Sequence, residues 1–255
     1  MIKIKNLNHT YKYCSKAAVK NINLHIKNGE NLVIIGSSGS GKSTLLKLIN
    51  RLLESSAGSI FIGEDDILNV TAKKAEKIRG RIGMIFQNFN LIERDSVIKN
   101  VLNGRLRYLS DFDTIIGRFR KEDYFIARES LDIVGLAEYE NKRIMDLSGG
   151  EKQRVAIART LSQKPDIILA DEPVSNLDPR LMREIMDLLK DICIKNGITL
   201  VTSLHFLDFA KRYGSRIVGL RDGEIVFDGK PDSLTDENIL NIYGNGNNWH
   251  INANV

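Results

Sequence analysis

The sequence predicts an α/β protein that carries an inserted helical segment. Short apolar runs of strand length alternate with helix-like patterns before about residue 88 and again after about residue 163. Between these two regions the apolar spacing is that of helices. The chain has 255 residues, of which 42% are hydrophobic, and this is enough for one large domain or for one domain with an inserted subdomain.

The first region reads as strands that lead into one helix. Residues 2–7 and 19–27 are strand-like, and the second of these strands ends at the turn KNGE. Residues 31–36, NLVIIG, form a continuous apolar run of buried-strand length, followed by a glycine-rich loop and by the helix-like stretch 41–53. Two further strands are expected before the insertion, at 58–63 and 81–86.

The insertion is helical, and after it strand and helix alternate again. Residues 96–109 and 121–136 have helical apolar spacing. Residues 166–171, DIILAD, predict a strand, and a helix over 179–197 begins with proline and ends at glycine. The last strands are expected at 198–203, 216–221 and 224–229, before a polar tail at 244–255.

Charge and cysteine content exclude some classes of protein. The net charge of +5 comes without any block of five or six like charges, so nucleic-acid binding is not expected. The two cysteines, Cys14 and Cys193, have no paired spacing, which indicates a reducing compartment. No secretory signal is visible, and the longest apolar runs fall far short of the roughly 20 residues that span a bilayer. We therefore expect a cytoplasmic protein that is not integral to a membrane.

The glycine-rich loop after residues 31–36 predicts a phosphate site. Its sequence, GSSGSGKST, satisfies the pattern G-x-x-x-x-G-K-[ST] between a strand and a helix. The glycines allow backbone N–H groups to surround phosphate oxygens, Lys42 supplies a positive charge, and the Ser43 hydroxyl can bind Mg²⁺. The residues of this loop are Gly36, Ser37, Ser38, Gly39, Ser40, Gly41, Lys42, Ser43 and Thr44.

Two adjacent acids follow the expected strand 166–171. A phosphate site of this type needs a carboxylate to hold the metal, and Asp171 is the candidate. Glu172, the next residue, can face a different target, the attacking water.

A second candidate anion site lies more than a hundred residues after the first. In LSGGEKQR, Ser148 followed by Glu151 fits the capping box of a helix N-terminus. Gly149 and Gly150 leave the backbone N–H groups of this helix start approachable. The residues alone do not explain why one chain needs two such sites.

The sequence resembles the ATP-binding cassette ATPases over nearly its whole length, because GSSGSGKST, LSGGEKQR and ILADEPVSNLD occur in that family's order and spacing. The family more often has alanine where this chain has Asn176. The resemblance implies a P-loop NTPase (RecA-like) core with an N-terminal antiparallel β subdomain and an inserted α-helical subdomain. A single cassette domain is then expected over 1–243, with the core at about 1–87 and 164–243 and the helical subdomain at about 88–163.

The resemblance also implies roles for individual residues. Tyr11 resembles the aromatic residue that stacks on adenine, with Tyr13 as the nearby competitor. Gln87 resembles the glutamine that joins the core to the helical subdomain and contacts Mg²⁺ or water. Glu172 resembles the general base, and His205 resembles the histidine that contacts the γ-phosphate of ATP.

In this family two copies pack head to tail, and each ATP lies between the phosphate loop of one copy and the signature helix of the other. Ser148, Gly149 and Gly150 resemble that signature loop, and Asp178 matches the loop that crosses to the partner's site. The second anion site would then serve the partner's ATP. A helix N-terminus, with its free N–H groups and positive dipole end, suits a γ-phosphate.

A single cassette of this size resembles the separate ATPase subunit of a bacterial importer. Such a subunit lies at the cytoplasmic face of the cell membrane as a homodimer, with integral membrane permease subunits and a periplasmic or lipoprotein-type solute-binding protein. The stretches RIGMIFQNFNLIERDSVIKNVLNGRL and SLHFLDFAKRYGSRIVGLRDGEIVFDGKP look most like the phosphonate-import group.

Three alternatives stay open. One is an ATPase of the same kind that serves phosphite, phosphate, methionine or polar amino acids. The second is a soluble cassette protein of DNA repair or translation, against which the single cassette and the absence of sustained heptads argue. The third is a module that binds ATP without turnover, against which Glu172 and His205 argue.

Overall fold

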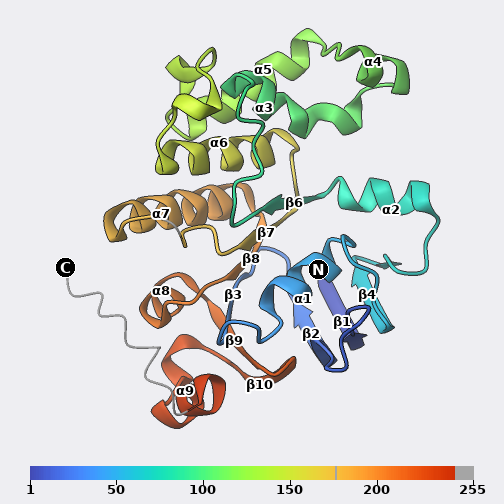
Figure 1. Cartoon of the computed structure of the whole chain (residues 1–255), viewed down its shortest axis with the longest axis vertical. Coiled ribbons are helices and arrows are strands. Elements are labelled where there is room, and N and C mark those ends of the chain that lie inside the picture. Colours follow the sequence, from blue (N-terminus) through green and yellow to red (C-terminus); the bar gives the residue numbers. More distant parts are fainter. Residues whose placement is uncertain (176, 245–255) are drawn as a thin grey trace.

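The computed structural model describes residues 1–175 and 177–244. Asn176 lies outside the described residues, and so do residues 245–255. The latter make up nearly all of the expected polar tail. Figure 1 shows two sheets with a mainly helical region at one end of the molecule.

A six-stranded sheet forms the centre of the fold, in the order β10-β9-β3-β8-β7-β6. The pairs from β6 to β9 are parallel, and only β10 runs antiparallel, on the edge beside β9. The strands β6, β7 and β8 are buried along their whole length, as expected of parallel strands that are covered on both faces. Their bounds are β3 Asn31–Ile35, β6 Ile82–Ile85, β7 Ile167–Asp171, β8 Thr199–Ser203, β9 Arg216–Arg221 and β10 Glu224–Gly229.

A smaller antiparallel sheet of four strands has the order β2-β1-β4-β5. Its bounds are β1 Ile2–His9, β2 Val19–Ile26, β4 Ala57–Ile62 and β5 Asp65–Asp66. In β1 and β2 buried and exposed residues largely alternate, because one face of the sheet packs on the core and the other faces solvent. This sheet confirms the antiparallel β subdomain that the resemblance implies.

Two hydrophobic cores cover the two faces of the six-stranded sheet. On β3, Leu32 and Ile34 belong to the core that the antiparallel sheet and helix α1 (Lys42–Ile49) close, and Val33 and Ile35 belong to the other. The second core includes residues of helices α7 (Pro179–Asn196), α8 (Leu207–Tyr213) and α9 (Asp236–Tyr243). Strand β3 therefore lies between two packed layers, and the loop that follows it starts from a rigid base.

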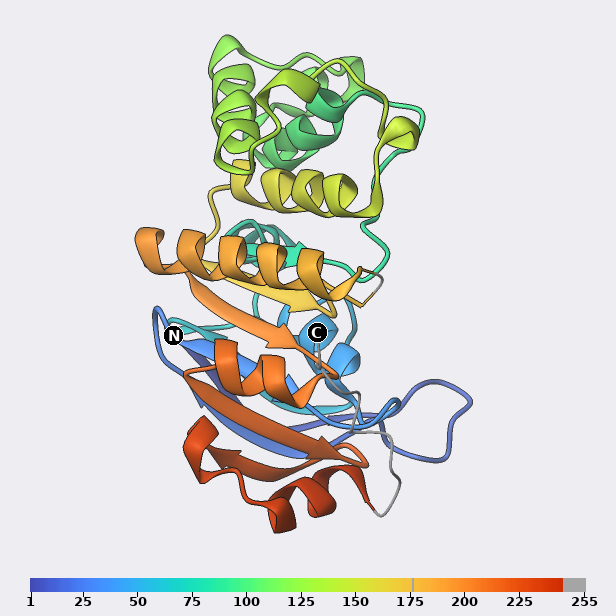
Figure 2. The same cartoon turned by 90° about the vertical axis from the view of Figure 1, so that its left-hand side faces the viewer.

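The helical region shares the second core, to which its helices also contribute residues. Its helix α6 (Gly149–Ser162) lies beside α7 in Figure 2 and contacts it. A buried ion pair within this region joins Arg105 Nε to Asp123 Oδ1 at 2.9 Å, and Arg105 also donates to the Ser162 carbonyl. The other helices of this region are α3 Val97–Leu102, α4 Asp111–Ile116 and α5 Lys121–Ile133, with the 3₁₀ turns η1 Asn103–Tyr108, η2 Ala137–Tyr139 and η3 Ile144–Asp146.

The expected strands agree with the structure to within about two residues, whereas some helices differ. The expected helix 96–109 changes to a 3₁₀ turn after α3. Gly104 lies at this change, where the chain passes close to α6: a Cβ atom on Gly104 would lie 2.2 Å from the Arg159 carbonyl oxygen. The helix after the phosphate loop is shorter than the expected 41–53. Sequence patterns missed helices α2 (Ala72–Arg79), α4, α8 and α9 and the 3₁₀ turn η4 (Pro231–Ser233).

Within residues 1–175 and 177–244, no helix combines the length and the apolar character that crossing a bilayer requires.

Candidate functional site

The loop Gly36–Gly41 joins the end of β3 to the start of α1. Two of its glycines cannot be replaced without moving neighbouring backbone. A Cβ on Gly36 would lie 2.3 Å from the Leu220 carbonyl oxygen, and one on Gly41 would lie 2.3 Å from the Ala18 carbonyl oxygen. Both residues also have positive φ, +153° and +105°, which side-chain-bearing residues rarely adopt. The sequence therefore closes this loop tightly against β9 and against the residue before β2.

Lys42 is the first residue of α1, and it is only 4% exposed. Its ammonium donates to the carbonyl oxygens of Gly36, at 2.8 Å, and Ser37, at 3.0 Å. Burial lowers the pKa of Lys42, and the nearby carboxylates of Glu172 and Asp171 oppose that shift. The loop thus holds one positive charge at its centre, where an anion could replace the carbonyl contacts.

The first carboxylate after β7 faces α1. The Ser43 hydroxyl donates to Asp171 Oδ1 at 2.8 Å, and the Ser203 hydroxyl donates to the same oxygen at 2.9 Å. Asp171 is 5% exposed, so its charge is sheltered from water. A hydroxyl and a carboxylate oxygen side by side are the type of ligand that Mg²⁺ prefers, and the donor set therefore fits that ion.

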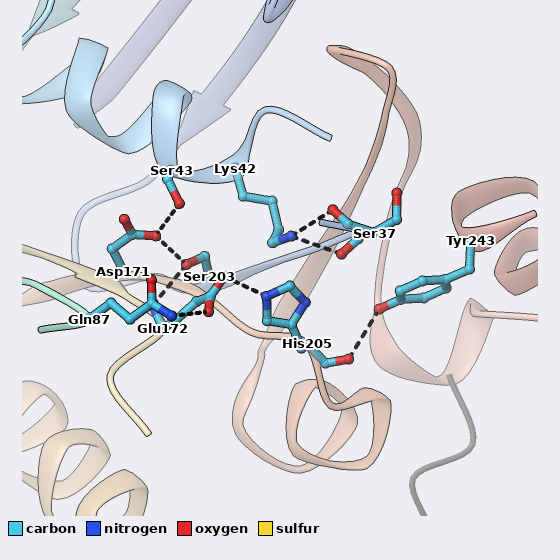
Figure 3. Close-up of polar contacts among 10 residues, drawn as sticks. Ser37, Lys42, Ser43, Gln87, Asp171, Glu172, Ser203, His205 and Tyr243 are labelled. Carbon is cyan, nitrogen blue, oxygen red and sulfur yellow. Dashed lines mark hydrogen bonds and ion pairs between the residues drawn. The ribbon is translucent and has the colours of Figure 1, made fainter. Parts of the chain in front are cut away.

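The second carboxylate faces a different pair of side chains (Figure 3). Glu172 Oε2 accepts from Gln87 Nε2 at 3.0 Å, and Glu172 Oε1 lies 2.5 Å from His205 Nε2. The Glu172 backbone has a φ of +48°, an uncommon conformation for a residue other than glycine and one found at functional sites. The carboxylates of Asp171 and Glu172, although adjacent in the sequence, therefore contact different side chains.

The charge state of Glu172 suits a base. The hydrogen bond from His205 is the main cause that lowers the pKa of Glu172, and the charge of Lys42 adds to it, while burial acts in the opposite direction. The carboxylate is therefore ionised at neutral pH and can accept a proton.

Tyr11 and Tyr13 differ in their contacts. The Tyr11 hydroxyl lies 3.0 Å from Thr44 Oγ1, and its ring meets the His9 ring edge to face, with 4.7 Å between the ring centroids. Tyr13 is 95% exposed. This geometry favours Tyr11 over Tyr13 as the aromatic residue beside the phosphate loop.

These groups border one open cavity of about 460 Å³. Its lining joins segments that lie far apart in the sequence: the residues before β2, the phosphate loop, the end of β6 and the ends of β7 and β8. The lining residues are Tyr11, Ala18, Ser38, Gly39, Gly41, Lys42, Ser43, Thr44, Gln87, Glu172 and His205.

The signature residues lie elsewhere. Ser148 is the N-cap of α6, and the expected capping box is present: its hydroxyl accepts from the Glu151 amide, and Glu151 Oε2 accepts from the Ser148 amide at 2.7 Å. Asp178 is the N-cap of α7. Neither these caps nor Gly149 and Gly150 line the cavity. One chain therefore does not bring its two anion-binding helix starts together.

Sequence reasoning missed Ser203. Besides its bond to Asp171, its hydroxyl accepts from the Glu172 amide at 3.0 Å, so one side chain orients both acids. Its place as the last residue of the predicted strand 198–203, two residues before His205 in the sequence, was the available signal.

Comparisons with known proteins agree with this geometry. Residues 19–175 match the family described as ABC transporter. A phosphonates import ATP-binding protein of Bdellovibrio bacteriovorus is 49% identical, over 96% of this chain and 94% of that protein. One of Staphylococcus aureus is 48% identical, over 95% of this chain and 94% of that protein.

Solved structures give the same result. A dimeric ATP-binding cassette in a post-hydrolysis state, bound to ADP and Pi, has a TM-score of 0.79 at 38% identity and covers 91% of this chain and 99% of its own. The cassette cbiO1 of Clostridium perfringens, part of an ABC transporter complex, has a TM-score of 0.80 at 30% identity, with 94% and 92% covered. Together with the phosphate loop and the paired acids, these matches show that the chain belongs to the ABC transporter family of ATP-binding cassettes.

Proposed function

We propose that the chain is the ATP-hydrolysing subunit of an ABC importer and that its solute is a phosphonate. The observation that carries the catalytic part is Glu172, an ionised carboxylate that borders the phosphate-loop cavity between Gln87 and His205. The two relatives named as phosphonates import proteins support the choice of solute.

In this proposal ATP occupies the cavity with its phosphates on the loop Gly36–Thr44. Backbone N–H groups and Lys42 neutralise the β- and γ-phosphates, and Tyr11 stacks on adenine. Ser43, Asp171 and Gln87 would hold Mg²⁺, which neutralises charge on the phosphate oxygens when it is bound. Within the described residues there is no group of three or more His, Cys, Asp or Glu side chains that could hold a metal ion, and the proposed set instead uses hydroxyl, amide and one carboxylate oxygen.

Glu172 acts as the general base for the attacking water. Its lowered pKa keeps it ionised, and its bonds to Gln87 and His205 fix its orientation. His205, the other partner of Glu172, contacts the γ-phosphate in this proposal and responds to its loss. A module that binds ATP without turnover would have no use for this arrangement.

The second half of each site comes from another copy of the chain. The exposed caps Ser148 and Asp178 and the glycines after Ser148 lie away from their own chain's cavity, and the related cassette bound to ADP and Pi is dimeric. A head-to-tail homodimer would place the signature helix of one copy over the triphosphate in the other. Loss of the γ-phosphate would then weaken the interface.

The chain works, in this proposal, at the cytoplasmic face of the membrane with permease subunits and a solute-binding protein. We also propose the division into a core at about 1–87 and 164–243 and a helical subdomain at about 88–163 that receives the permease. Phosphite, phosphate, methionine or polar amino acids are alternative solutes, because the ATPase itself does not contact the solute.

Reconstitution with a permease and a solute-binding protein of the phosphonate-import type tests the proposal. Phosphate release from ATP should be slow for the isolated chain and should rise when a phosphonate is added to the complete complex in vesicles. Phosphite, phosphate, methionine and glutamine serve as competing solutes in parallel. No phosphate release from any assembly would contradict the ATPase assignment, and stimulation by another solute alone would contradict phosphonate import.

A further inference from the structure

Helix α9 packs on strands β9 and β10 of the six-stranded sheet. Its Ile242 side chain packs on Gly219 of β9, where a Cβ atom would lie only 2.5 Å from Ile242 Cδ1. Arg221 Nη1 donates to the Asn241 carbonyl at 2.9 Å. Gly219 in turn pairs with Ile35, the last residue of β3. Strand β9 therefore sets the position of α9 relative to the start of the phosphate loop.

The last residue of α9 reaches toward the catalytic side chains. The Tyr243 hydroxyl donates to the His205 carbonyl oxygen at 3.5 Å, and Figure 3 shows its ring directed at the His205 segment from the side opposite Glu172. Burial raises the pKa of Tyr243 to about 12, against a smaller opposing effect from the Gly36 backbone. The hydroxyl therefore keeps its proton at neutral pH and remains a donor.

The backbone at His205 needs such a partner. Strand β8 ends at Ser203 and helix α8 begins at Leu207, so His205 lies in the short turn between them. The N-cap residue of α8, Phe206, makes no side-chain capping bond. Among the described residues, the Tyr243 hydroxyl is the donor recorded for the His205 carbonyl. The flanks of this turn are anchored, since the Leu204 amide donates to the Ile34 carbonyl and the Ala210 amide donates to the Phe206 carbonyl. The Tyr243 hydroxyl is therefore the contact that acts on the His205 carbonyl itself.

We infer that Tyr243 is a positioning residue of the ATPase site: its hydroxyl holds the main chain at His205, and so keeps the His205 ring opposite Glu172. The C-terminal helix α9 then becomes part of the catalytic arrangement, although it lies more than thirty residues after His205 in the sequence. This inference rests on the proposed ATP hydrolysis, in which His205 and Glu172 act together.

The chain offers a matched control in Tyr213. Its hydroxyl donates its one proton mainly to Asp187 Oδ1 at 2.8 Å, and a backbone carbonyl, that of Arg183, lies 3.4 Å from the same hydroxyl. Burial likewise raises the pKa of Tyr213 to about 12. These contacts join α8 to α7 and do not involve the cavity. Tyr213→Phe therefore removes a comparable hydroxyl from the same second core.

The test compares Tyr243→Phe with Tyr213→Phe by two measurements. The first is the proton NMR spectrum of the histidine rings in the free chain at one pH. The sequence has four histidines, and the His205 signal is assigned by its loss in His205→Gln. We expect Tyr243→Phe to shift the His205 ring resonance and Tyr213→Phe to leave it in place.

The second measurement is ATP turnover in the reconstituted complex. Tyr243→Phe should lower kcat about threefold to tenfold, the usual effect of one lost hydrogen bond, and leave KM for ATP within about twofold. Tyr213→Phe should leave both constants near those of the native chain.

An unchanged His205 resonance in Tyr243→Phe, or an equal shift in both variants, would overturn the inference whatever the turnover rates. A shifted resonance with native kcat would also overturn it. If the native complex itself hydrolyses no ATP, the proposed function fails, and the NMR comparison still decides separately whether Tyr243 holds His205.

Discussion

The two glycine-rich helix starts of this chain differ in how complete they are. The phosphate loop before α1 is enclosed by its own chain: its lysine is 4% exposed, and carbonyls of other segments crowd Gly36 and Gly41. At the signature start of α6 both Ser148 and Gly149 are exposed, and among the described residues the Ser148 hydroxyl and amide bond to Glu151 of the same turn. Both present backbone N–H groups and a positive dipole end. In the proposed dimer the first is the half of the binding site that its own chain completes, and the second is the half that a second copy would complete.

The largest expected effect tests the chemistry on the enclosed side. Glu172→Gln keeps the shape of the side chain but removes the base, so turnover should fall by about 10² to 10⁴. ATP should still bind and should hold two copies together, because the interface-forming γ-phosphate is no longer removed. Phosphate release and light scattering with ATP measure the two properties. Native turnover in this variant would mean that another group activates the water.

The next effect removes the charge inside the phosphate loop. Lys42→Ala should weaken ATP binding by about 10- to 100-fold, since a charge-assisted hydrogen bond to the phosphates is lost. Fluorescence titration with a labelled ATP analogue measures the affinity. Lys47→Ala, on the same helix and half-buried, is the control and should bind ATP normally. Equal affinities in the two variants would show that the triphosphate does not lie on this loop.

A substitution at the open helix start should lower turnover and leave ATP binding intact, in contrast to Lys42→Ala. Ser148→Arg places a bulky side chain where the partner's triphosphate would approach, so turnover should fall by at least about tenfold while ATP affinity of the single chain stays within about twofold. Ser110→Arg is the matched control, because Ser110 also caps a helix, α4, through its hydroxyl. Weak ATP binding by Ser148→Arg would place the signature within its own chain's site and would remove the contrast between the two helix starts.

Mixing the two damaged chains sharpens the same comparison. A heterodimer of Lys42→Ala and Ser148→Arg has one site built from the intact phosphate loop of one copy and the intact signature of the other. We expect turnover in the mixture to recover to as much as about a quarter of the native rate, since about half of random dimers are mixed and each has one working site. Two inactive chains that stay inactive together would contradict the shared site.

The sequence predicted which residues form the enclosed half of the site, but it did not predict all the contacts that orient them. The pattern GSSGSGKST, with a buried strand before it, was sufficient for Lys42 and Ser43, because local backbone chemistry determines that loop. The capping box at Ser148 was equally readable, because it lies within four consecutive residues. Ser203 was missed, since its role depends on the register of β7 against β8, a long-range pairing that one sequence does not show.

The missed helices have a similar cause. In α4 no residue is buried. A helix is predicted from apolar residues that recur on the face it packs against a core, and α4 has no such face. Helix α8 has seven residues and α9 has eight, too short for a periodic pattern to be distinctive. Tyr243 could not be placed near His205 from the sequence, because the contact depends on how α9 packs on β9.

The smallest expected effect concerns the charge on the open half. The amide and hydroxyl of Ser148 donate to Glu151, and these bonds are the main causes that lower the pKa of Glu151. The capping box therefore favours the charged form. Its contribution to stability is present above the ordinary pKa of 4.5 and is lost as the pH falls through the lowered value. In the proposed dimer the same negative charge would lie close to the partner's triphosphate at neutral pH.

Glu151→Gln keeps an acceptor for the cap and removes this charge. In the Glu172→Gln background, ATP-dependent dimerisation should become about twofold to fivefold tighter, and the gain should shrink at high salt because exposed charges are screened. Glu122→Gln is the control, because it removes the same charge from the first turn of another helix, α5. It should leave dimerisation unchanged. If Glu151→Gln weakened the dimer, the carboxylate would contribute more by ordering the helix start than it costs by repulsion. The open half would then be a site that its own chain has already shaped for the second triphosphate.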